Sequence, residues 1–431
     1  MITKLKKLFS RIKKNELIRV GSSTSAANIL KMGVGIIVQK FIAVQLGPSG
    51  IAMIAQFQNY LSITTSLATG GIGQGVVKYI SEFRDNKSEF RKYVSNAIYV
   101  SLFCSFLVAI VQFIFIQRIS EQLFKTSEYT SILTVFGVTI FLFALNNVFI
   151  SLLNGFGQIK DYVVSNIVRS VIHLIMTTFL IWKLGLEGAL WSLSVIQSIV
   201  CVVTGYFIVR SKWYEIEIFF SGLDWKVIKR LLAFSLVAFS TMIFSPYTDI
   251  EIRNLIIGQL GIEQAGLYDA LVRLSRTYFT IITMSLSVYY VPKLSSIKDP
   301  VLIRKELIST SKIVFPIIFV ILLFVYLLSD FIFTLLYSSE FVSIKAILPM
   351  FLIGDFFRCC AMVLGYLFIA KARTTLFIIV SLSSLAIKYT IVYVSLPYLA
   401  LQAASLAHLS SLVFRLLSYS IMTAKLRLLR E

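Results

Sequence analysis

The sequence predicts an all-α membrane protein with about twelve transmembrane helices arranged as two six-helix lobes. Three observations predict this fold class: a succession of apolar stretches of about 20 residues, an uneven division of Lys and Arg between alternate connections, and an internal repeat at half the chain length. With 57% hydrophobic residues and a mean hydropathy of +0.84 over 431 residues, the chain lacks a segment that could form a soluble domain. The continuous apolar runs also exclude an outer-membrane barrel, whose strands alternate apolar and polar residues.

The apolar stretches follow one another from Val20 almost to the end of the chain. Each is long enough to cross a hydrocarbon core as an α-helix. The predicted spans are 20–46, 50–80, 93–116, 129–153, 163–182, 188–209, 231–257, 266–292, 308–328, 346–370, 375–395 and 403–424.

Positive charge is divided very unevenly between the two sides that these spans define. The formal net charge is +20, and of 41 Lys and Arg residues 27 lie in the termini and connections of one side, four lie on the other, and ten lie in spans. The positive-inside rule therefore places both termini in the cytoplasm, which requires an even number of spans. This distribution argues against nucleic-acid binding as the reason for the charge.

The two ends of the chain are basic. Residues 2–20 read either as an amphipathic helix lying on the anionic inner leaflet or as a solvated tail ahead of the first span, and not as a cleavable signal. The predicted organisation is a basic N-terminal segment (1–19), an N-lobe (20–210), a cytoplasmic linker (211–230), a C-lobe (231–424) and a basic C-terminal tail (425–431).

The two halves of the chain repeat each other. The motif Gln45-Leu46-Gly47 returns as Gln259-Leu260-Gly261 at an offset of 214 residues, and Lys78 then corresponds to Lys293 after one insertion. Because each half holds six spans, both enter the membrane in the same direction, as in transporters with parallel repeats. We expect two such bundles to face each other across a central cleft.

Several spans contain residues that bend helices. Glycine permits backbone conformations that other residues avoid, and proline removes a backbone hydrogen bond, although both are also common in membrane helices. The predicted bending positions are Gly70, Gly71, Gly73 and Gly75 in the second span, Pro246 in the seventh as a candidate hinge, Pro316 in the ninth and Pro349 in the tenth.

The charges inside the spans carry the functional prediction, because ten cations there face only four acids. Three acids have an arginine on the same helix face: Asp249 with Arg253, Asp269 with Arg273 and Asp355 with Arg358. Such pairs either neutralise each other as structural ion pairs or belong to a wet cavity. Glu251 has no local partner, and Lys40 and Lys312 are near span ends, where lysine reaches the headgroups.

An unpaired cation at membrane depth costs several kcal/mol unless it faces water or an anion. The surplus therefore predicts an anionic substrate. The candidate substrate-binding residues are Lys31, Arg253, Arg273, Arg276, Arg169, Arg358, Lys388 and Arg415, and the candidates for coupling to a proton or Na⁺ are Asp249, Glu251, Asp269 and Asp355.

Other chemistry finds little support in the sequence. His173 and His408 have no ligand at metal-binding spacing and are expected to be packed, neutral imidazoles, and the four cysteines (Cys104, Cys201, Cys359 and Cys360) are expected to be packing residues inside spans. The chain has no Walker loop and no nucleophile with a supporting base. We therefore predict a transporter without a cofactor or metal, driven by an ion gradient or by the gradient of its substrate.

Three segments carry a resemblance to a known family. GGIGQGVVKYI (Gly70 to Ile80), SLSVYYVPKLS (Ser285 to Ser295) and, most specifically, IGDFFRCCAMVLGYLFIAKA (Ile353 to Ala372) resemble the matching segments of bacterial Wzx flippases, the O-antigen and enterobacterial-common-antigen (lipid III) translocases. Asp355 lies in this pattern. The resemblance extends over nearly the whole chain, whereas Lys31 and Arg276 are proposed from their depth and spacing alone.

The resemblance implies the fold of the multidrug/oligosaccharidyl-lipid/polysaccharide exporter superfamily. It also implies an undecaprenyl-pyrophosphate-linked oligosaccharide as the substrate, moved from the inner to the outer leaflet of the bacterial inner membrane. A pyrophosphate is a compact anion that arginine and lysine bind well. The expected partners are this substrate, membrane lipids and possible glycan polymerase and assembly proteins, and the chain is expected to work as a monomer.

Two other functions stay open at this point. A multidrug or metabolite exporter of the same fold would prefer an acidic or aromatic cleft for organic cations. A membrane scaffold that organises glycan-assembly enzymes without transporting anything would need no surplus of charge at membrane depth.

Overall fold

The computed structural model describes residues 16–235, 239 and 242–425, with the backbone alone for 16–29, 285 and 288, and the described chain is almost entirely helical. The predicted basic segments at the two ends, 1–19 and 425–431, lie largely outside the described residues. The chain forms two compact units. One comprises the chain up to Phe41 together with Leu61–Phe239, and the other comprises Ile42–Tyr60 and the chain from Ser240 onward.

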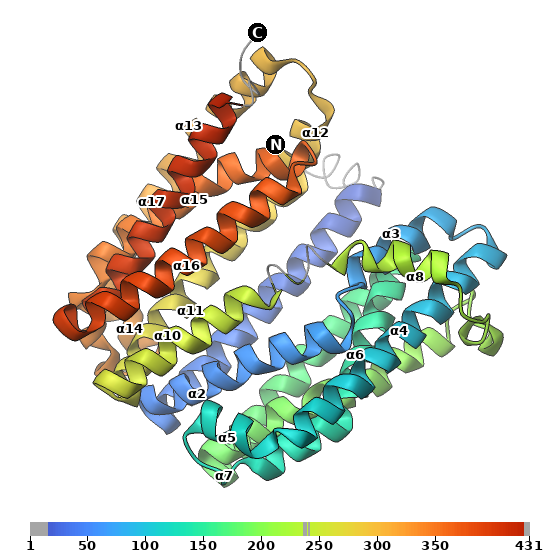
Figure 1. Ribbon diagram of the computed structural model, residues 1–431, viewed down its shortest axis with the longest axis horizontal. Helices are drawn as coiled ribbons and strands as arrows, with labels where there is room; N and C mark the ends of the chain where they lie inside the picture. Colours follow the sequence, from blue (N-terminus) through green and yellow to red (C-terminus); the bar gives the residue numbers. More distant parts are fainter. Residues whose placement is uncertain (1–15, 236–238, 240–241, 426–431) are drawn as a thin grey trace, which may run out of the picture. The chain divides into compact units, whose positions relative to one another are not determined.

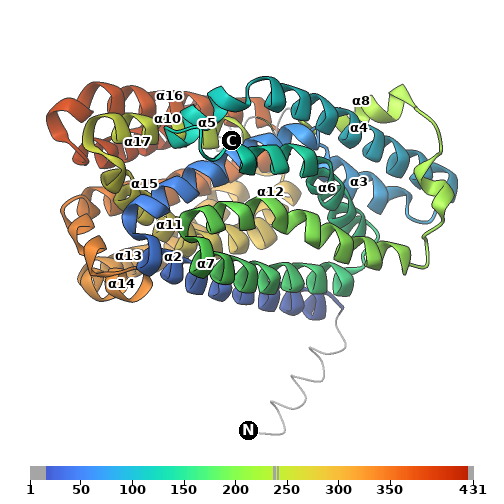
Figure 2. The ribbon, with the colours of Figure 1, turned by 90° about the horizontal axis from the view of Figure 1, so that it is seen from below.

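The first unit is built mainly from α3, α4, α6 and α7. Figures 1 and 2 show α6 lying beside both α4 and α7. Short helices connect these long ones. The elements are α2 (Glu16–Ala68), α3 (Gly73–Phe83), α4 (Lys87–Ile114), α5 (Ile116–Phe124), α6 (Thr130–Gly155), α7 (Ile159–Val209), η1 (Ile216–Phe219) and α8 (Trp225–Leu232).

The second unit places α17 against both α15 and α16, while α10 packs against α11 and α16 (Figure 1). Residues 42–60 of α2 also belong to this unit. The elements are α10 (Phe244–Leu260), α11 (Ile262–Ser285), η2 (Leu286–Tyr290), α12 (Val291–Ser296), α13 (Pro300–Leu327), α14 (Ser329–Leu336), η3 (Ser339–Ala346), α15 (Leu348–Ala370), α16 (Thr374–Leu399) and α17 (Gln402–Lys425).

Among the described residues, seven helices are long and apolar enough to cross a membrane. Two of them, α2 and α7, are each long enough for two crossings, and their backbones leave the helical conformation at Gly47 and Gly185. The predicted first and second spans thus share α2, and the fifth and sixth share α7. The remaining predicted spans of the second half fall on α10, α11 and α17, whose charged or small polar residues lower their hydropathy.

The repeat seen in the sequence returns in the backbone. Gly47 and Gly261 have φ values of 62° and 90° at the ends of corresponding helices. Gly185 (φ 57°, ψ −132°) corresponds to Ala400 (φ 47°, ψ −138°), 215 residues later. Gly157 and Ala372 form a third pair with positive φ. The same turns therefore recur through both halves, which is evidence for a parallel repeat independent of residue identity.

The predicted bending residues differ in whether they interrupt a helix in the structure. The second predicted span is interrupted after Ala68, because Gly70 and Gly71 adopt positive φ between α2 and α3. Pro316 lies inside α13. Pro349 does not bend its helix, since it stands in the first turn of α15, where no intrahelical partner for its nitrogen is needed. Pro246 is likewise in the first turn of α10.

Large apolar side chains cover the outside of the long helices. Phe106 and Ile114 of α4, and Val320 and Phe324 of α13, are each at least 60% exposed. Exposed side chains of this size would be unfavourable in water, and on helices of this length they are suited to contact lipid tails. The outer surfaces of both units are thus those of a multi-pass membrane protein.

The segment after α7 packs on the first unit. Ile218, Val227 and Leu231 belong to the same buried apolar cluster as Val76 and Tyr93. The Trp213 ring stacks on Phe156 with centroids 4.0 Å apart. This packing attaches most of the predicted linker (211–230) to the first unit, and the division of the chain into lobes at 210 and 231 stays a prediction.

Candidate functional site

A cavity of about 150 Å³ lies within the second unit, enclosed by α10, α11, α15, α16 and α17. Its wall carries small polar side chains, His408 and five charged residues. Four of these five are cations and one is a carboxylate: Arg276, Arg358, Lys388, Arg415 and Asp249. A wall with this surplus of positive charge in a low-dielectric setting favours an anion.

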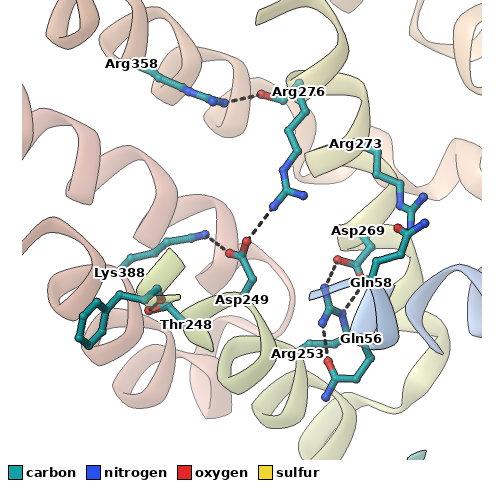
Figure 3. Close-up of polar contacts among 12 residues, drawn as sticks. Gln56, Gln58, Thr248, Asp249, Arg253, Asp269, Arg273, Arg276, Arg358 and Lys388 are labelled. Atoms are coloured by element: carbon teal, nitrogen blue, oxygen red, sulfur yellow. Dashed lines mark hydrogen bonds and ion pairs between the residues drawn. The ribbon is translucent and has the colours of Figure 1, made fainter. Parts of the chain in front are cut away.

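Asp249 lies between two of the cations (Figure 3). Its Oδ2 accepts a hydrogen bond from Nη2 of Arg276 at 2.7 Å, and its Oδ1 accepts one from Nζ of Lys388 at 3.2 Å. These contacts join α10, α11 and α16. The Arg276 side chain remains 54% exposed, so most of its donor groups are free to meet another acceptor.

The other two cations are less well neutralised. The Arg358 guanidinium lies 4.2 Å from the centroid of the Phe279 ring and donates to Oγ of Ser275 at 3.2 Å. Its nearest carboxylate oxygen, on Asp355, is 3.9 Å away. Nε of Arg415 is buried without a hydrogen-bond partner among the described residues. Both side chains therefore keep donors for a ligand.

A fully buried carboxylate, that of Asp355, lies behind the cavity wall. It accepts hydrogen bonds from the Tyr278 hydroxyl and makes a 3.0 Å contact with Nε2 of His408. The His408 ring stacks on Phe351, with the ring centroids 4.0 Å apart. A Cβ at Gly354 would approach Cδ2 of His408 to 2.7 Å, so the glycine lets α15 and α17 come close enough for this contact. The Gly354-Asp355 pair thus fixes His408 in the wall.

A separate ion pair is sealed from solvent. Nε and Nη2 of Arg253 contact the two oxygens of Asp269 at 2.5 and 2.7 Å, and Arg253 also donates to Oε1 of Gln56. Arg253 is 3% exposed and Asp269 4%. Nearby, Arg273 donates to Oε1 of Gln58 at 2.8 Å (Figure 3). The two glutamines come from the part of α2 that packs in the second unit, and they anchor it there.

The expected same-helix pairs are wrong for two of the three acids. Asp249 contacts Arg276 and Lys388 in place of Arg253, and Asp269 contacts Arg253 in place of Arg273. For Asp269 the reason is geometric, because Arg253 on the neighbouring helix presents two N–H groups to the two carboxylate oxygens. Asp355 and Arg358 approach only to 3.9 Å.

The candidate cations of the first half lie apart from this network. The Lys31 side chain is exposed and that of Arg169 half-buried, and neither has an acid within ion-pair distance in the described part of the chain. The first unit therefore contains cations in predicted spans without the carboxylates that accompany them in the second.

Glu251 occupies a different environment from Asp249, although both lie on α10. It lines a second, mainly apolar cavity of about 420 Å³ with Tyr247, Leu382 and Tyr389. Its Oε1 is buried without a hydrogen-bond partner among the described residues. The two acids thus belong to separate cavities of the same unit.

Several residues of this network were not predicted from the sequence. Gln56, Gln58, Tyr278 and Ser275 are neutral, and neutral polar residues in an apolar span are too common to single out. His408 was expected to be packed, but its carboxylate partner lies 53 residues earlier in the chain. The Gly354-Asp355 pair was the one available signal for that contact.

Comparison with known proteins identifies the family of the chain and a relative of similar length. The model of the family described as "Polysaccharide biosynthesis protein" matches residues 17–298. The chain is 28% identical over 391 residues to a protein of Escherichia coli (strain K12) named "Lipid III flippase", covering 90% of this chain and 94% of that protein.

Solved structures give the fold. A multidrug resistance MATE family transporter of the MOP superfamily, in its inward-facing conformation, matches with a TM-score of 0.78 and 13% identity over 93% of this chain and 96% of that one. Its outward-facing conformation matches with a TM-score of 0.69 and 14% identity over 95% of each chain. The predicted all-α fold of a polytopic membrane protein is confirmed, and the count of about twelve spans in two six-helix lobes stays a prediction.

Proposed function

The chain belongs to the polysaccharide biosynthesis protein family, and from this premise we propose that it is a flippase for an oligosaccharide linked to a lipid pyrophosphate. Similarity to the lipid III flippase over 90% of the chain supports the reaction class. The observation that carries the chemical part of the proposal is the cavity of the second unit, where four cations face one carboxylate. Such a site suits a substrate with a compact, multiply charged phosphate group.

We assign different roles to the cations of the predicted spans. Arg276, Arg358, Lys388 and Arg415 hold the pyrophosphate, since each lines the cavity and keeps donors or charge in excess of its partners. Arg253 serves the structure, because Asp269 and Gln56 take up its donors. Lys31, Arg169 and Arg273 stay proposed substrate contacts.

The membrane context belongs to the same proposal. We place the protein in the bacterial inner membrane with both termini in the cytoplasm, working as a monomer by alternating access. Among the four candidate coupling carboxylates, Glu251 has a buried oxygen without a partner in the described residues, whereas Asp249, Asp269 and Asp355 are engaged by cations or by hydrogen bonds. A proton or Na⁺ at Glu251 is therefore the proposed coupling arrangement.

The test is transport by reconstituted protein. Vesicles carrying a fluorescent sugar on undecaprenyl pyrophosphate are treated with a quencher that reaches the outer leaflet only. Wild type should expose the protected half of the label. Arg276→Gln and Arg358→Gln should each slow this at least about tenfold, as is typical of a lost charge-assisted contact.

The matched control is Lys312→Gln, which removes an exposed cation of α13 that does not line the cavity. It should leave transport unchanged. Undiminished transport by Arg276→Gln and Arg358→Gln, at wild-type protein levels, would show that the cavity does not bind the substrate. No transport of this lipid by wild type, together with export of organic cations, would replace the proposed function by that of a drug exporter.

A further inference from the structure

Among the described residues, Asp249 is the one carboxylate that lines the 150 Å³ cavity of the second unit. Its two oxygens are occupied by Arg276 and Lys388. These are two of the four cations that an entering anion would meet. The carboxylate and the anion therefore compete for the same donors.

The position of Asp249 makes this competition unavoidable. The residue is 9% exposed and contacts helices on two sides, so its side chain has little room to withdraw. An anion within hydrogen-bond reach of Arg276 and Lys388 would lie beside the carboxylate. Two negative groups at this distance in a low-dielectric site repel each other strongly.

We propose that Asp249 is an internal competitor of the substrate's phosphate group, which engages Arg276 and Lys388 before that group enters and weakens its binding when it does. This inference rests on the proposed function and deepens it. A transporter must release what it binds, so a site with four unopposed cations would hold a pyrophosphate too long. Asp249 supplies the opposing charge, and the full contact of Arg276 and Lys388 with its carboxylate is restored on release.

Asp249 can act as a structural link between helices or as a competitor of the anion. If the residue only holds α10, α11 and α16 together, its neutralisation should loosen the cavity and weaken anion binding. If it competes with the anion, the same change should strengthen binding. The two roles thus predict effects of opposite sign.

The experiment measures binding of inorganic sulfate to the full-length purified protein in detergent by calorimetry, with chloride balancing the ionic strength. Sulfate is a dianion of the size of a phosphate group, and its charge is constant near neutral pH. Asp249→Asn should bind sulfate about tenfold or more tightly than wild type. Glu263→Gln, which neutralises an exposed carboxylate of α11 that does not line the cavity, should bind like wild type.

In reconstituted vesicles Asp249→Asn should lower KM and kcat together, because a substrate that is held more tightly leaves more slowly. A weaker or unchanged sulfate affinity of Asp249→Asn would overturn the proposal, as would sulfate binding by neither protein. Each of these outcomes leaves the flippase assignment to the transport test with Arg276→Gln and Arg358→Gln.

A second comparison keeps the proposal testable if Asp249→Asn does not fold. Lys388→Met removes one partner of Asp249, and the double variant Asp249→Asn with Lys388→Met removes one charge of each sign. The double variant should bind sulfate more tightly than Lys388→Met alone. An equal or lower affinity of the double variant would contradict the competition.

Discussion

The two halves of this chain share one backbone plan and distribute their charges in opposite ways. In the second half, carboxylates lie in the interior, where Asp249, Asp269 and Asp355 each contact a cation or an imidazole from a neighbouring helix. In the first half, the described ion pairs lie at the ends of helices and in connections, and the exposed Lys31 and half-buried Arg169 of the predicted spans have no described acid partner. Repetition of the fold therefore does not imply repetition of the chemistry.

The ion pairs of the first half serve to attach a segment. Glu215 accepts hydrogen bonds from Lys87 and Arg91 at the start of α4, and Arg91 is also 3.3 Å from Glu217. Nη1 of Arg230 donates to the Tyr93 hydroxyl at 3.0 Å. These exposed contacts hold the segment after α7 against the first unit. Each exposed pair of this kind contributes little to the free energy of unfolding. Removing one partner of a buried pair, in contrast, destabilises the fold strongly, because it leaves an uncompensated charge.

The largest expected effect comes from breaking the buried pair of the second half. Asp269→Asn leaves the Arg253 guanidinium buried without its counterion, which should lower the free energy of unfolding by about 3–5 kcal/mol. Thermal unfolding in detergent measures this as a large decrease in Tm. The matched control, Glu215→Gln, removes a carboxylate with two cationic partners at the surface and should change Tm much less.

A second variant separates burial of charge from loss of packing. Arg253→Met with Asp269→Leu replaces the pair by apolar side chains, and it should recover most of the stability that Asp269→Asn loses. Equal Tm values for Asp269→Asn and Glu215→Gln would contradict the contrast between a buried and an exposed network.

An intermediate effect is expected where the repeat uses glycine in one half and alanine in the other. Gly185 (ψ −132°) and Ala400 (ψ −138°) have nearly the same positive φ, and this sparsely populated conformation costs a residue with a side chain about 1–3 kcal/mol. Gly185→Ala should therefore destabilise the protein by roughly that amount, and Ala400→Gly should stabilise it by about 0.5–1 kcal/mol.

Ala407→Gly is the control for this comparison, since Ala407 lies inside α17 and the change should destabilise by about 1 kcal/mol. The measurement is again Tm in detergent. A loss of stability in Ala400→Gly, similar to that in Ala407→Gly, would show that the two turns are not equivalent.

The smallest effect is a pH dependence of the attached segment. Hydrogen bonds from Lys87 and Arg91 lower the pKa of Glu215 below its ordinary value near 4.5. A carboxylate with a lowered pKa stabilises the folded arrangement above its ordinary pKa, and this contribution disappears as the pH falls through the lowered value. We expect the segment to detach only in acid below pH 4.5.

Fluorescence of Trp213, which stacks on Phe156, reports this step in a variant whose Trp182, Trp191 and Trp225 are changed to Phe. In Glu215→Gln the acid transition should be absent or shifted. Glu89→Gln is the control, because Glu89 pairs with Lys92 and does not contact the segment. An unaltered acid transition in Glu215→Gln would exclude Glu215 as its origin.

Most of the architecture could be predicted from the sequence. Long apolar runs must be helical in lipid, where every backbone polar group needs an internal partner, so hydropathy alone gives the spans. The repeat of Gln45-Leu46-Gly47 at Gln259-Leu260-Gly261 predicted corresponding positions in the two halves, and the structure ends a helix at both Gly47 and Gly261. Pro349 was misplaced, because sequence cannot distinguish a proline in the first turn from one in the middle of an apolar run.

The surplus of cations at membrane depth was also determined by the sequence, and with it the expectation of an anionic substrate. Only the tertiary structure decided which acid faces which base. Periodicity along one helix cannot reveal that Arg253 reaches Asp269 or that Asp249 lies between Arg276 and Lys388. The physical reason is that burial and hydrogen-bond geometry between helices determine the energy of a charge in the interior, and both depend on how residues far apart in the chain are packed.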